Sequence, residues 1–300
     1  MDSVIFGAGT WGKGLKKGLE KYYGIHICAI CDNDKSKWGS IIDNVKITPP
    51  QELLNTDFEK IFVCIANRTE FSMVEAQLIH MGISRDKIVL MRTSKEYQDA
   101  FIQLDPFRKN WIKEFSDYTR KIGLKGCTAE CGVYFGETSM FINKYWPDQT
   151  LHLFDTFEGF SEKDIEYDSN NFASFKNSEF SKNPFKIDTP DSMLDIVKAR
   201  MCYPENLKIH KGLFSECSKD IEDQFCFVNL DMDLYQPQLD GLRFFWNKMQ
   251  LGGIILLHDY FNPKLPGVMK SVEDFEKEIG QVLPKFPIGD HCSIAIIKYN

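Results

Sequence analysis

Short apolar runs alternate with amphipathic helical segments along most of the 300-residue chain. Runs that fit strands cover residues 4–6, 25–31, 60–65 and 87–90, and then residues 127–131, 151–154, 206–210, 226–230, 253–257 and 292–298. Glycine-containing turns or acidic residues follow many of these runs. This order is typical of βα units around a parallel sheet. The sequence therefore predicts an α/β protein with two Rossmann-like domains.

A helical segment without strand patterns divides the chain into two halves. We expect residues 1–92 to form a small Rossmann-like domain, residues 93–122 a helical linker, and residues 123–300 a larger Rossmann-like domain. Pro106 suits the first position of the linker helix. Aromatic residues recur in that helix at helical spacing, and we interpret this stripe as packing between the two halves: Phe107, Trp111, Phe115 and Tyr118.

Composition and charge narrow the classes of function. The formal net charge is −7 and no basic block offsets it, which argues against nucleic acid as a partner. No apolar run approaches the roughly 20 residues of a membrane-spanning helix, and the N-terminus begins with a strand rather than a signal region. Nine cysteines are scattered, and the Cys28–Cys31 pair fits a buried strand better than a redox or zinc site. We therefore expect a cytoplasmic protein with reduced thiols.

The first strand runs into a GxGxxG motif formed by Gly7, Gly9 and Gly12. Asp32 ends the next strand, 20 positions after Gly12, where a dinucleotide-binding fold holds the ribose. The domain, however, has about half the length of a full dinucleotide-binding fold. Residues 31–50 resemble the small Rossmann-like modules of sugar-modifying and nucleotide-sugar-modifying proteins. Three interpretations stay open: a nucleotide site at these four residues, a sugar-nucleotide site, or a turn that binds nothing and needs glycine for steric reasons alone.

The second half carries polar side chains at the ends of most predicted strands. Its first strand ends in Glu130 and continues into a glycine loop with Gly132 and Gly136, ahead of a helix. In open α/β sheets, ligands bind beyond the carboxyl ends of the strands. The side chains expected at that edge are Glu130, Asp155, Asp231, Asp233, His258 and Asp259. Their clustering predicts one site for ligand binding and chemistry.

Six segments within residues 125–276 carry a family resemblance: ECGVYFGETSM, LHLFDTFEGF, KGLF, VNLDMDLYQPQLDGL, GGIILLHDYF and GVMKSVEDF. Together they resemble the class I S-adenosylmethionine-dependent methyltransferases, and more closely the macrocin-type O-methyltransferases, which methylate sugar hydroxyls with magnesium. The resemblance implies a seven-stranded sheet with an antiparallel last strand. It also implies methyl transfer to a sugar hydroxyl. The attached small domain favours a nucleotide-activated sugar or a surface-glycan precursor, as in capsule or polysaccharide biosynthesis.

The resemblance implies roles for individual residues. Those that would bind S-adenosylmethionine are Glu130, Gly132, Gly136, Asp155, Thr156, Gly212 and Asp231. Asp155 would accept hydrogen bonds from the ribose hydroxyls, and Glu130 would face the ammonium group indirectly. Asp231 and Asp259 would hold Mg²⁺ or Mn²⁺, because hard cations prefer carboxylate oxygens. Asp233, beside Asp231, would accept the proton of the sugar hydroxyl.

His258 departs from the family pattern, which has two consecutive acids at this place. Imidazole is a poor ligand for magnesium and a better one for manganese, iron or zinc. His258 is therefore a third metal ligand, a catalytic base, or a strand-end side chain without a role at the metal; the sequence leaves these alternatives open.

Residues 161–188 are polar and aromatic, without a regular period, and directly follow a predicted strand end. We interpret this segment as a lid over the acceptor site, because a fully solvated loop would not explain its phenylalanines. These are Phe172, Phe175, Phe180 and Phe185. Asp188 and Thr189 precede a helix that starts at Pro190.

Other classes of protein fit parts of the sequence. Asp231 and Asp233 form a DxD pattern, as in metal-dependent glycosyltransferases, but the glycine loop at residues 130–136 argues against that class. The N-terminal glycine motif would suit a nicotinamide-dependent sugar-nucleotide oxidoreductase, although residues 1–92 lack a YxxxK pair. A non-catalytic binding protein is disfavoured by the intact set of acids. We expect a homo-oligomer that binds a small carbohydrate or nucleotide sugar.

Overall fold

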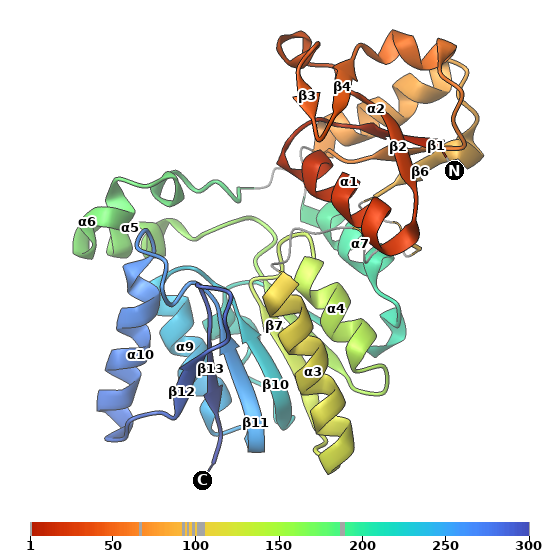
Figure 1. Cartoon of the computed structure of the whole chain (residues 1–300). Helices are drawn as coiled ribbons and strands as arrows, with labels where there is room; N and C mark the ends of the chain where they lie inside the picture. Colours follow the sequence, from red (N-terminus) through yellow and green to blue (C-terminus); the bar gives the residue numbers. More distant parts are fainter. Residues whose placement is uncertain are drawn as a thin grey trace. The chain divides into compact units, whose positions relative to one another are not determined.

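The computed structural model describes residues 2–65, 68–91, 94, 96–97, 100, 106–186 and 190–299. The chain forms two compact units, Met1–Leu104 and Asp105–Asn300, each with its own sheet (Figure 1). The predicted α/β class with two Rossmann-like domains is confirmed.

The first unit is built on a six-stranded sheet in the order β3-β4-β2-β1-β5-β6. Its strands are β1 Asp2–Phe6, β2 His26–Cys31, β3 Ile41–Ile42, β4 Val45–Thr48, β5 Lys60–Val63 and β6 Ile88–Leu90, and its helices are α1 Thr10–Tyr23 and α2 Arg68–His80. The sequence pattern missed the β3–β4 hairpin, because two and four residues are too short to show a period. Its turn residues Asp43 and Asn44 both have positive φ, 44° and 66°, as a tight hairpin turn requires.

The second unit is built on a seven-stranded sheet in the order β12-β13-β11-β10-β7-β8-β9. Its strands are β7 Cys127–Cys131, β8 Leu151–Asp155, β9 Leu207–Lys211, β10 Phe225–Leu230, β11 Met249–Leu257, β12 Lys285–Pro287 and β13 Ile294–Ile297. Strands β7 to β11 are parallel, and β13 is antiparallel to both its neighbours. The predicted antiparallel last strand is therefore confirmed. No apolar run predicted β12, because it is a three-residue strand with two exposed positions.

Helices flank this sheet on both sides (Figure 1). The helices of the second unit are α3 Pro106–Ile122, α4 Glu137–Tyr145, α5 Glu162–Asn171, α6 Ala173–Lys176, α7 Pro190–Arg200, α8 Phe214–Cys217, α9 Tyr235–Trp246 and α10 Pro266–Ile279. Helices α9 and α10 pack against each other, as do α3 and α4. All six residues of β10 are buried, which is the pattern of a central parallel strand covered on both faces.

Helix α3 begins at Pro106, as predicted, but its buried face differs from the predicted aromatic stripe. Phe107 and Tyr118 are 63% and 53% exposed. Phe115 packs within the second unit, with its ring centre 6.3 Å from that of Trp146 and 6.0 Å from that of Phe227. The face that is buried carries Arg108, Ile112, Ser116 and Thr119. The helix was therefore predicted correctly, but the large aromatic residues did not identify the helix face that packs against the core.

The segment predicted as an irregular lid is largely helical over its described residues, 161–186. It contains α5, α6 and a 3₁₀ turn at Glu179–Lys182. Ser161 caps α5 by accepting a hydrogen bond from the Asp164 backbone N–H. Phe175 is fully buried, and Phe172 and Phe180 pack against the main hydrophobic core. These contacts hold short helices whose polar sequences show no clear amphipathic period. Residues 187–189, including the predicted cap at Asp188 and Thr189, lie outside the described residues.

Asp168 attaches α5 to the start of α9. Its buried carboxylate accepts a hydrogen bond from the Tyr235 backbone N–H, at 3.3 and 3.4 Å from its two oxygens. Burial raises the pKa of Asp168 to about 7. Because the folded pKa lies above the unfolded value of about 4, ionisation favours the unfolded chain, and stability falls as the pH rises between these two values.

We expect Asp168→Asn to be more stable than the native chain at pH 8, because the amide keeps an acceptor for Tyr235 and cannot ionise. The native chain loses up to about 1.4 kcal/mol per pH unit between about pH 4 and pH 7, so the advantage of the variant should shrink as the pH is lowered through this window. Urea unfolding at pH 5 and pH 8 measures the difference. Glu166→Gln, an exposed position on the same helix, is the control. An advantage of Asp168→Asn that is equal at both pH values would contradict this account.

Candidate active site

The carboxyl ends of the central strands are level, so the residues that follow them meet. Leu230 at the end of β10 pairs with Cys131 of β7 on one side and with Leu257 of β11 on the other. The next residues along the chain are Gly132, Asp231 and His258. This register places three of the predicted site residues side by side at one edge of the sheet.

A cavity of about 410 Å³ lies at this edge. Seven of the predicted site residues line it: Gly132, Asp155, Thr156, Asp231, Asp233, His258 and Asp259. The predicted lid contributes Ser161, Asp164, Phe180 and Phe185, and β8 and the segment after it add Phe154, Gly159 and Phe160. Gly136 and Gly212 do not line the cavity, although Leu213 and Phe214, directly after Gly212, do.

Glycine is required in the loop after β7. Gly132 has a φ of 84°, and a Cβ at this position would overlap the backbone carbonyl oxygen of Asp231. Gly136, with a φ of 74°, precedes α4, and its missing side chain leaves room for Val197 and Met201. The loop therefore lies directly against the backbone of Asp231.

Asp155 at the end of β8 holds the glycine loop in place. Its Oδ2 accepts hydrogen bonds from the backbone N–H groups of Val133 and Tyr134, at 2.6 and 2.9 Å, and its Oδ1 accepts one from Phe157, at 2.6 Å. Burial raises the pKa of Asp155, and these three donors act against that rise. A carboxylate offers about four acceptor positions, so Asp155 still has a position for a ligand hydroxyl.

Glu130 is buried below the cavity rather than exposed to it. It accepts a hydrogen bond from Asn229 Nδ2 at 3.0 Å and another from the Ser139 hydroxyl. Burial raises the pKa of Glu130 to about 8. The structure therefore gives Glu130 no direct access to the cavity, and any contact it has with a bound ligand runs through its neighbours.

Three carboxylates and one imidazole form an ionic cluster beside the cavity. Carboxylate oxygens of Asp231, Asp233 and Asp259 lie within 4.8 Å of one another. His258 Nδ1 lies 3.0 Å from Asp231 Oδ1 and 2.8 Å from Asp259 Oδ2. The imidazole of His258 thus lies between Asp231 and Asp259, the two acids predicted as metal ligands.

The pKa values in the cluster diverge. Burial raises the pKa of Asp233 well above its usual value, and the charges of Asp259 and Asp231 add to the rise. Burial alone would also raise the pKa values of Asp231 and Asp259, but His258 holds both below their usual range. Burial would lower the pKa of His258, yet its two carboxylate partners raise it well above the usual value. The cluster therefore favours ionised Asp231 and Asp259, protonated His258 and neutral Asp233.

The backbone at this edge is strained. Tyr134, Asp233 and Asp259 line the cavity and have φ values of 48°, 63° and 58°. Non-glycine residues rarely adopt this conformation, which costs on the order of 1 kcal/mol or more at each position. The surrounding fold maintains that strain, and it aims the side chains of both Asp233 and Asp259 into the cavity.

Sequence analysis missed Arg108. This residue of α3 is almost fully buried, and its Nη2 donates to Asp231 Oδ2 at 2.9 Å and to Asn229 Oδ1 at 2.8 Å. The sequence does place Arg108 at helical spacing from Ile112, Ser116 and Thr119, which form the buried face of the helix. A charged residue on the buried face of a helix requires a partner of opposite charge in the core.

The N-terminal motif folds into the predicted turn. A Cβ at Gly12 would overlap the carbonyl oxygen of Gly7, whereas a Cβ at Gly9 would meet nothing within 4 Å. Asp32 Oδ2 accepts hydrogen bonds from the Ala8 backbone N–H at 2.7 Å and from Lys37 Nζ at 3.0 Å. Contacts within the chain thus explain why position 12 requires glycine. They do not explain the glycine at position 9, where space for a ligand remains.

The strand order, the glycine loop after the first strand and the acids at the strand ends define an open α/β sheet with a ligand-sized cavity at the carboxyl ends of its strands. The chain belongs to the macrocin-O-methyltransferase (TylF) family, which it matches over residues 107–292. This match confirms the resemblance carried by the six sequence segments. Residues 2–89 match a second family, C2185-like, N-terminal.

Solved structures support the fold. The O-methyltransferase NovP is 16% identical and superposes with a TM-score of 0.57, covering 77% of this chain and 99% of its own. The calicheamicin methyltransferase CalS11 is 16% identical with a TM-score of 0.52, covering 79% of this chain and 94% of its own. No curated protein matches the chain significantly. None of the helices within the described residues is long and apolar enough to cross a membrane.

Arg108→Met should destabilise the protein by about 3 kcal/mol, because it leaves the Asp231 carboxylate buried without its guanidinium partner. Urea unfolding measures the loss. Lys113→Met on the same helix removes an exposed partner of Asp117 and should cost about 1 kcal/mol or less.

A double variant makes this test specific. Adding Asp231→Asn to Arg108→Met should recover part of the lost stability, since the unpaired charge is then removed. A cost for Arg108→Met as small as that for Lys113→Met would show that the pair does not hold the site together.

Proposed function

We propose that this O-methyltransferase transfers the methyl group of S-adenosylmethionine to a sugar hydroxyl, assisted by a divalent metal ion. The observation that carries the proposal is a single cavity with two kinds of lining. One part is the glycine loop with Asp155 and Thr156, and the other is the ionic cluster after β10 and β11. A cofactor and an acceptor bound in these two parts would be neighbours.

The first part suits the cofactor. Asp155 has a free acceptor position for a ribose hydroxyl, and the loop at Gly132 brings backbone groups close to the ligand. Phe154 and Phe214 line the same cavity and offer aromatic surface to an adenine ring. Glu130 would act on the methionine end through Ser139 and Asn229, its hydrogen-bond partners.

The second part suits a divalent cation by its donor set and its charge. Asp231, Asp233 and Asp259 offer carboxylate oxygens, which Mg²⁺ and Mn²⁺ prefer. The cluster with Arg108 is neutral when His258 and Asp233 are protonated. It is equally neutral when both are deprotonated and a divalent cation is present. We place Asp231 and Asp259 as the ligands, and His258 beside them, because its Nδ1 already faces both carboxylates.

A bound metal ion would lower the pKa of an acceptor hydroxyl and orient it. The remaining chemistry falls to the side chains. Asp233 would accept the hydroxyl proton on its carboxylate, and a sulfonium cofactor bound beside it would supply the methyl group, with an O–CH₃ bond formed for the S–CH₃ bond broken and the positive charge of the sulfur lost. Phe160, Phe180 and Phe185 exclude water from this step, and the buried setting of Asp233 makes it a stronger base than an exposed carboxylate.

The acceptor we propose is a nucleotide-activated sugar or a surface-glycan precursor for capsule or polysaccharide biosynthesis. Support comes from the N-terminal unit, in which Gly7, Gly9, Gly12 and Asp32 form a nucleotide-type turn. We place the reaction in the cytoplasm, where thiols stay reduced, as the scattered cysteines of the sequence lead us to expect.

Calorimetric titration of S-adenosylmethionine into the metal-stripped chain should show micromolar affinity. Asp155→Asn should weaken it by about 10–100-fold, the value of a hydrogen bond to a charged group. Glu158→Gln, an exposed position three residues along the chain, should bind as the native chain does. A folded sample that gives no heat with S-adenosylmethionine, but binds NADH or a nucleotide sugar, would overturn the cofactor assignment and favour the N-terminal turn as the leading site.

Asp233→Asn should lower the rate of S-adenosylhomocysteine formation by about 10²–10⁴-fold with little change in cofactor affinity, because it removes the base. Asparagine tolerates the positive φ at this position, so the backbone is preserved. Asp43→Asn, also at positive φ, is the matched control in the first unit. The assay uses a panel of nucleotide sugars as acceptors. EDTA should stop the native reaction and Mg²⁺ should restore it, whereas full activity of Asp233→Asn would exclude this residue as the base.

A further inference from the structure

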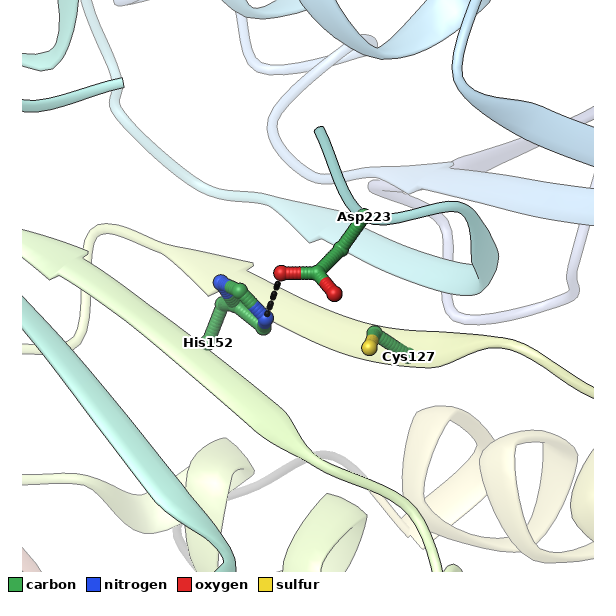
Figure 2. Close-up of side chains that lie close together, drawn as sticks. All are labelled: Cys127, His152 and Asp223. Atoms are coloured by element: carbon green, nitrogen blue, oxygen red, sulfur yellow. Dashed lines mark ion pairs between the residues drawn. The ribbon is translucent and has the colours of Figure 1, made fainter. Parts of the chain in front are cut away.

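A second group of side chains that can bind a metal ion lies near the amino ends of the strands of the same sheet. Cys127 begins β7, His152 is the second residue of β8, and Asp223 belongs to the loop that leads into β10. Figure 2 shows the three side chains converging from these separate segments. Their ligand atoms all lie within 4.8 Å of one another. The catalytic acids, in contrast, follow the carboxyl ends of the strands.

His152 is the central member of this group. Its side chain is fully buried, and its Nδ1 lies 3.0 Å from His210 Nε2. Its Nε2 is buried without a hydrogen-bond partner, although Asp223 Oδ2 lies only 3.4 Å away (Figure 2). Burial and the neighbouring His210 lower the pKa of His152 to about 4, so the ring is neutral at pH 7. A buried nitrogen next to a carboxylate, with no satisfactory hydrogen bond, is suited to a cation held by both groups.

The distances agree with tetrahedral coordination. Zinc bonds of about 2.0–2.1 Å to nitrogen and about 2.0–2.2 Å to oxygen place those two atoms about 3.3–3.5 Å apart. The observed separation of His152 Nε2 and Asp223 Oδ2 is 3.4 Å. A sulfur ligand would lie about 3.6 Å from the nitrogen. Cys127 Sγ lies within 4.8 Å of a ring nitrogen of His152 and of a carboxylate oxygen of Asp223, so a change in the Cys127 side-chain rotamer would bring it into the coordination shell.

We propose that Cys127, His152 and Asp223 form a binding site for a zinc-type divalent transition-metal ion, with the fourth position open to water. Thiolate and imidazole ligands select zinc or cobalt over magnesium. This site would therefore bind a different metal ion from the ionic cluster beside the cavity. Asp223 is partly exposed, which gives the ion a path from solvent.

Two neighbours set the affinity of the site. With a metal ion on His152 Nε2, the Nδ1–H of the same ring would donate to His210 Nε2, which lies 3.0 Å away, and such an outer partner is typical of metal-binding histidines. Lys208 Nζ lies 3.0 Å from Asp223 Oδ2, the same oxygen that faces His152. The lysine therefore competes with the metal ion for that oxygen.

Titration of Co²⁺ into the metal-stripped full-length chain tests the proposal directly. A thiolate-to-cobalt charge-transfer band should appear in the near-ultraviolet, saturate at one equivalent and disappear when Zn²⁺ is added. Cys127→Ser should remove the band. Cys292→Ser should leave it unchanged, and this control is needed because Cys292 lies beside His258 and Asp259 in the catalytic cluster.

Substitutions of the two neighbours keep all three ligands and so test the geometry. His210→Phe should retain the band and weaken Zn²⁺ binding by about 10–100-fold, whereas His210→Gln, which keeps an acceptor, should weaken it less. Lys208→Gln should tighten binding by up to about fivefold, as expected for removal of an exposed ion pair. Absence of a thiolate band in the native chain, or a band that survives Cys127→Ser and is lost in Cys292→Ser, would overturn the proposal.

Discussion

Asp231 and Asp259 keep their negative charge in a buried place because two cations, Arg108 and His258, lie against them. Much of the site depends on this balance. Arg108 comes from α3, which precedes the first strand of the sheet, and its guanidinium also binds Asn229 within β10. Asn229 in turn donates to Glu130 in β7. A single chain of charged and polar contacts thus joins the helix, two central strands and the residues that line the cavity.

Level strand ends explain why residues from three separate strands line one cavity. Cys131, Leu230 and Leu257 are in register, so the glycine loop, the DxD segment and the His258–Asp259 pair begin at the same height. Gly132 then touches the backbone of Asp231 so closely that no side chain fits between them. A shift of the glycine loop would therefore move Asp231 beside it, which couples the two parts of the cavity.

The sequence predicted most of this arrangement, because the decisive side chains follow immediately after strongly apolar strands. Asp155, Asp231, Asp233, His258 and Asp259 could be placed at one edge from strand order alone. The failures share a different cause. The β3–β4 hairpin and β12 are too short to show a period. The short helices within residues 161–186 are held by Phe172, Phe175 and Phe180, which contact core residues from distant parts of the sequence. Arg108 was missed because its partner, Asp231, stands 123 positions further along the chain.

The place of Arg108 bears on where the catalytic part of the chain begins. Every motif that carries the family resemblance lies after residue 123, and a border drawn there looks natural from the sequence. The compact unit, however, starts at Asp105 and includes α3. A fragment cut at residue 123 would retain each recognisable motif and lose the guanidinium that neutralises the first acid of the DxD segment. In this protein, the segment that contains all the family motifs is therefore shorter than the segment that contains the charge partners of the site.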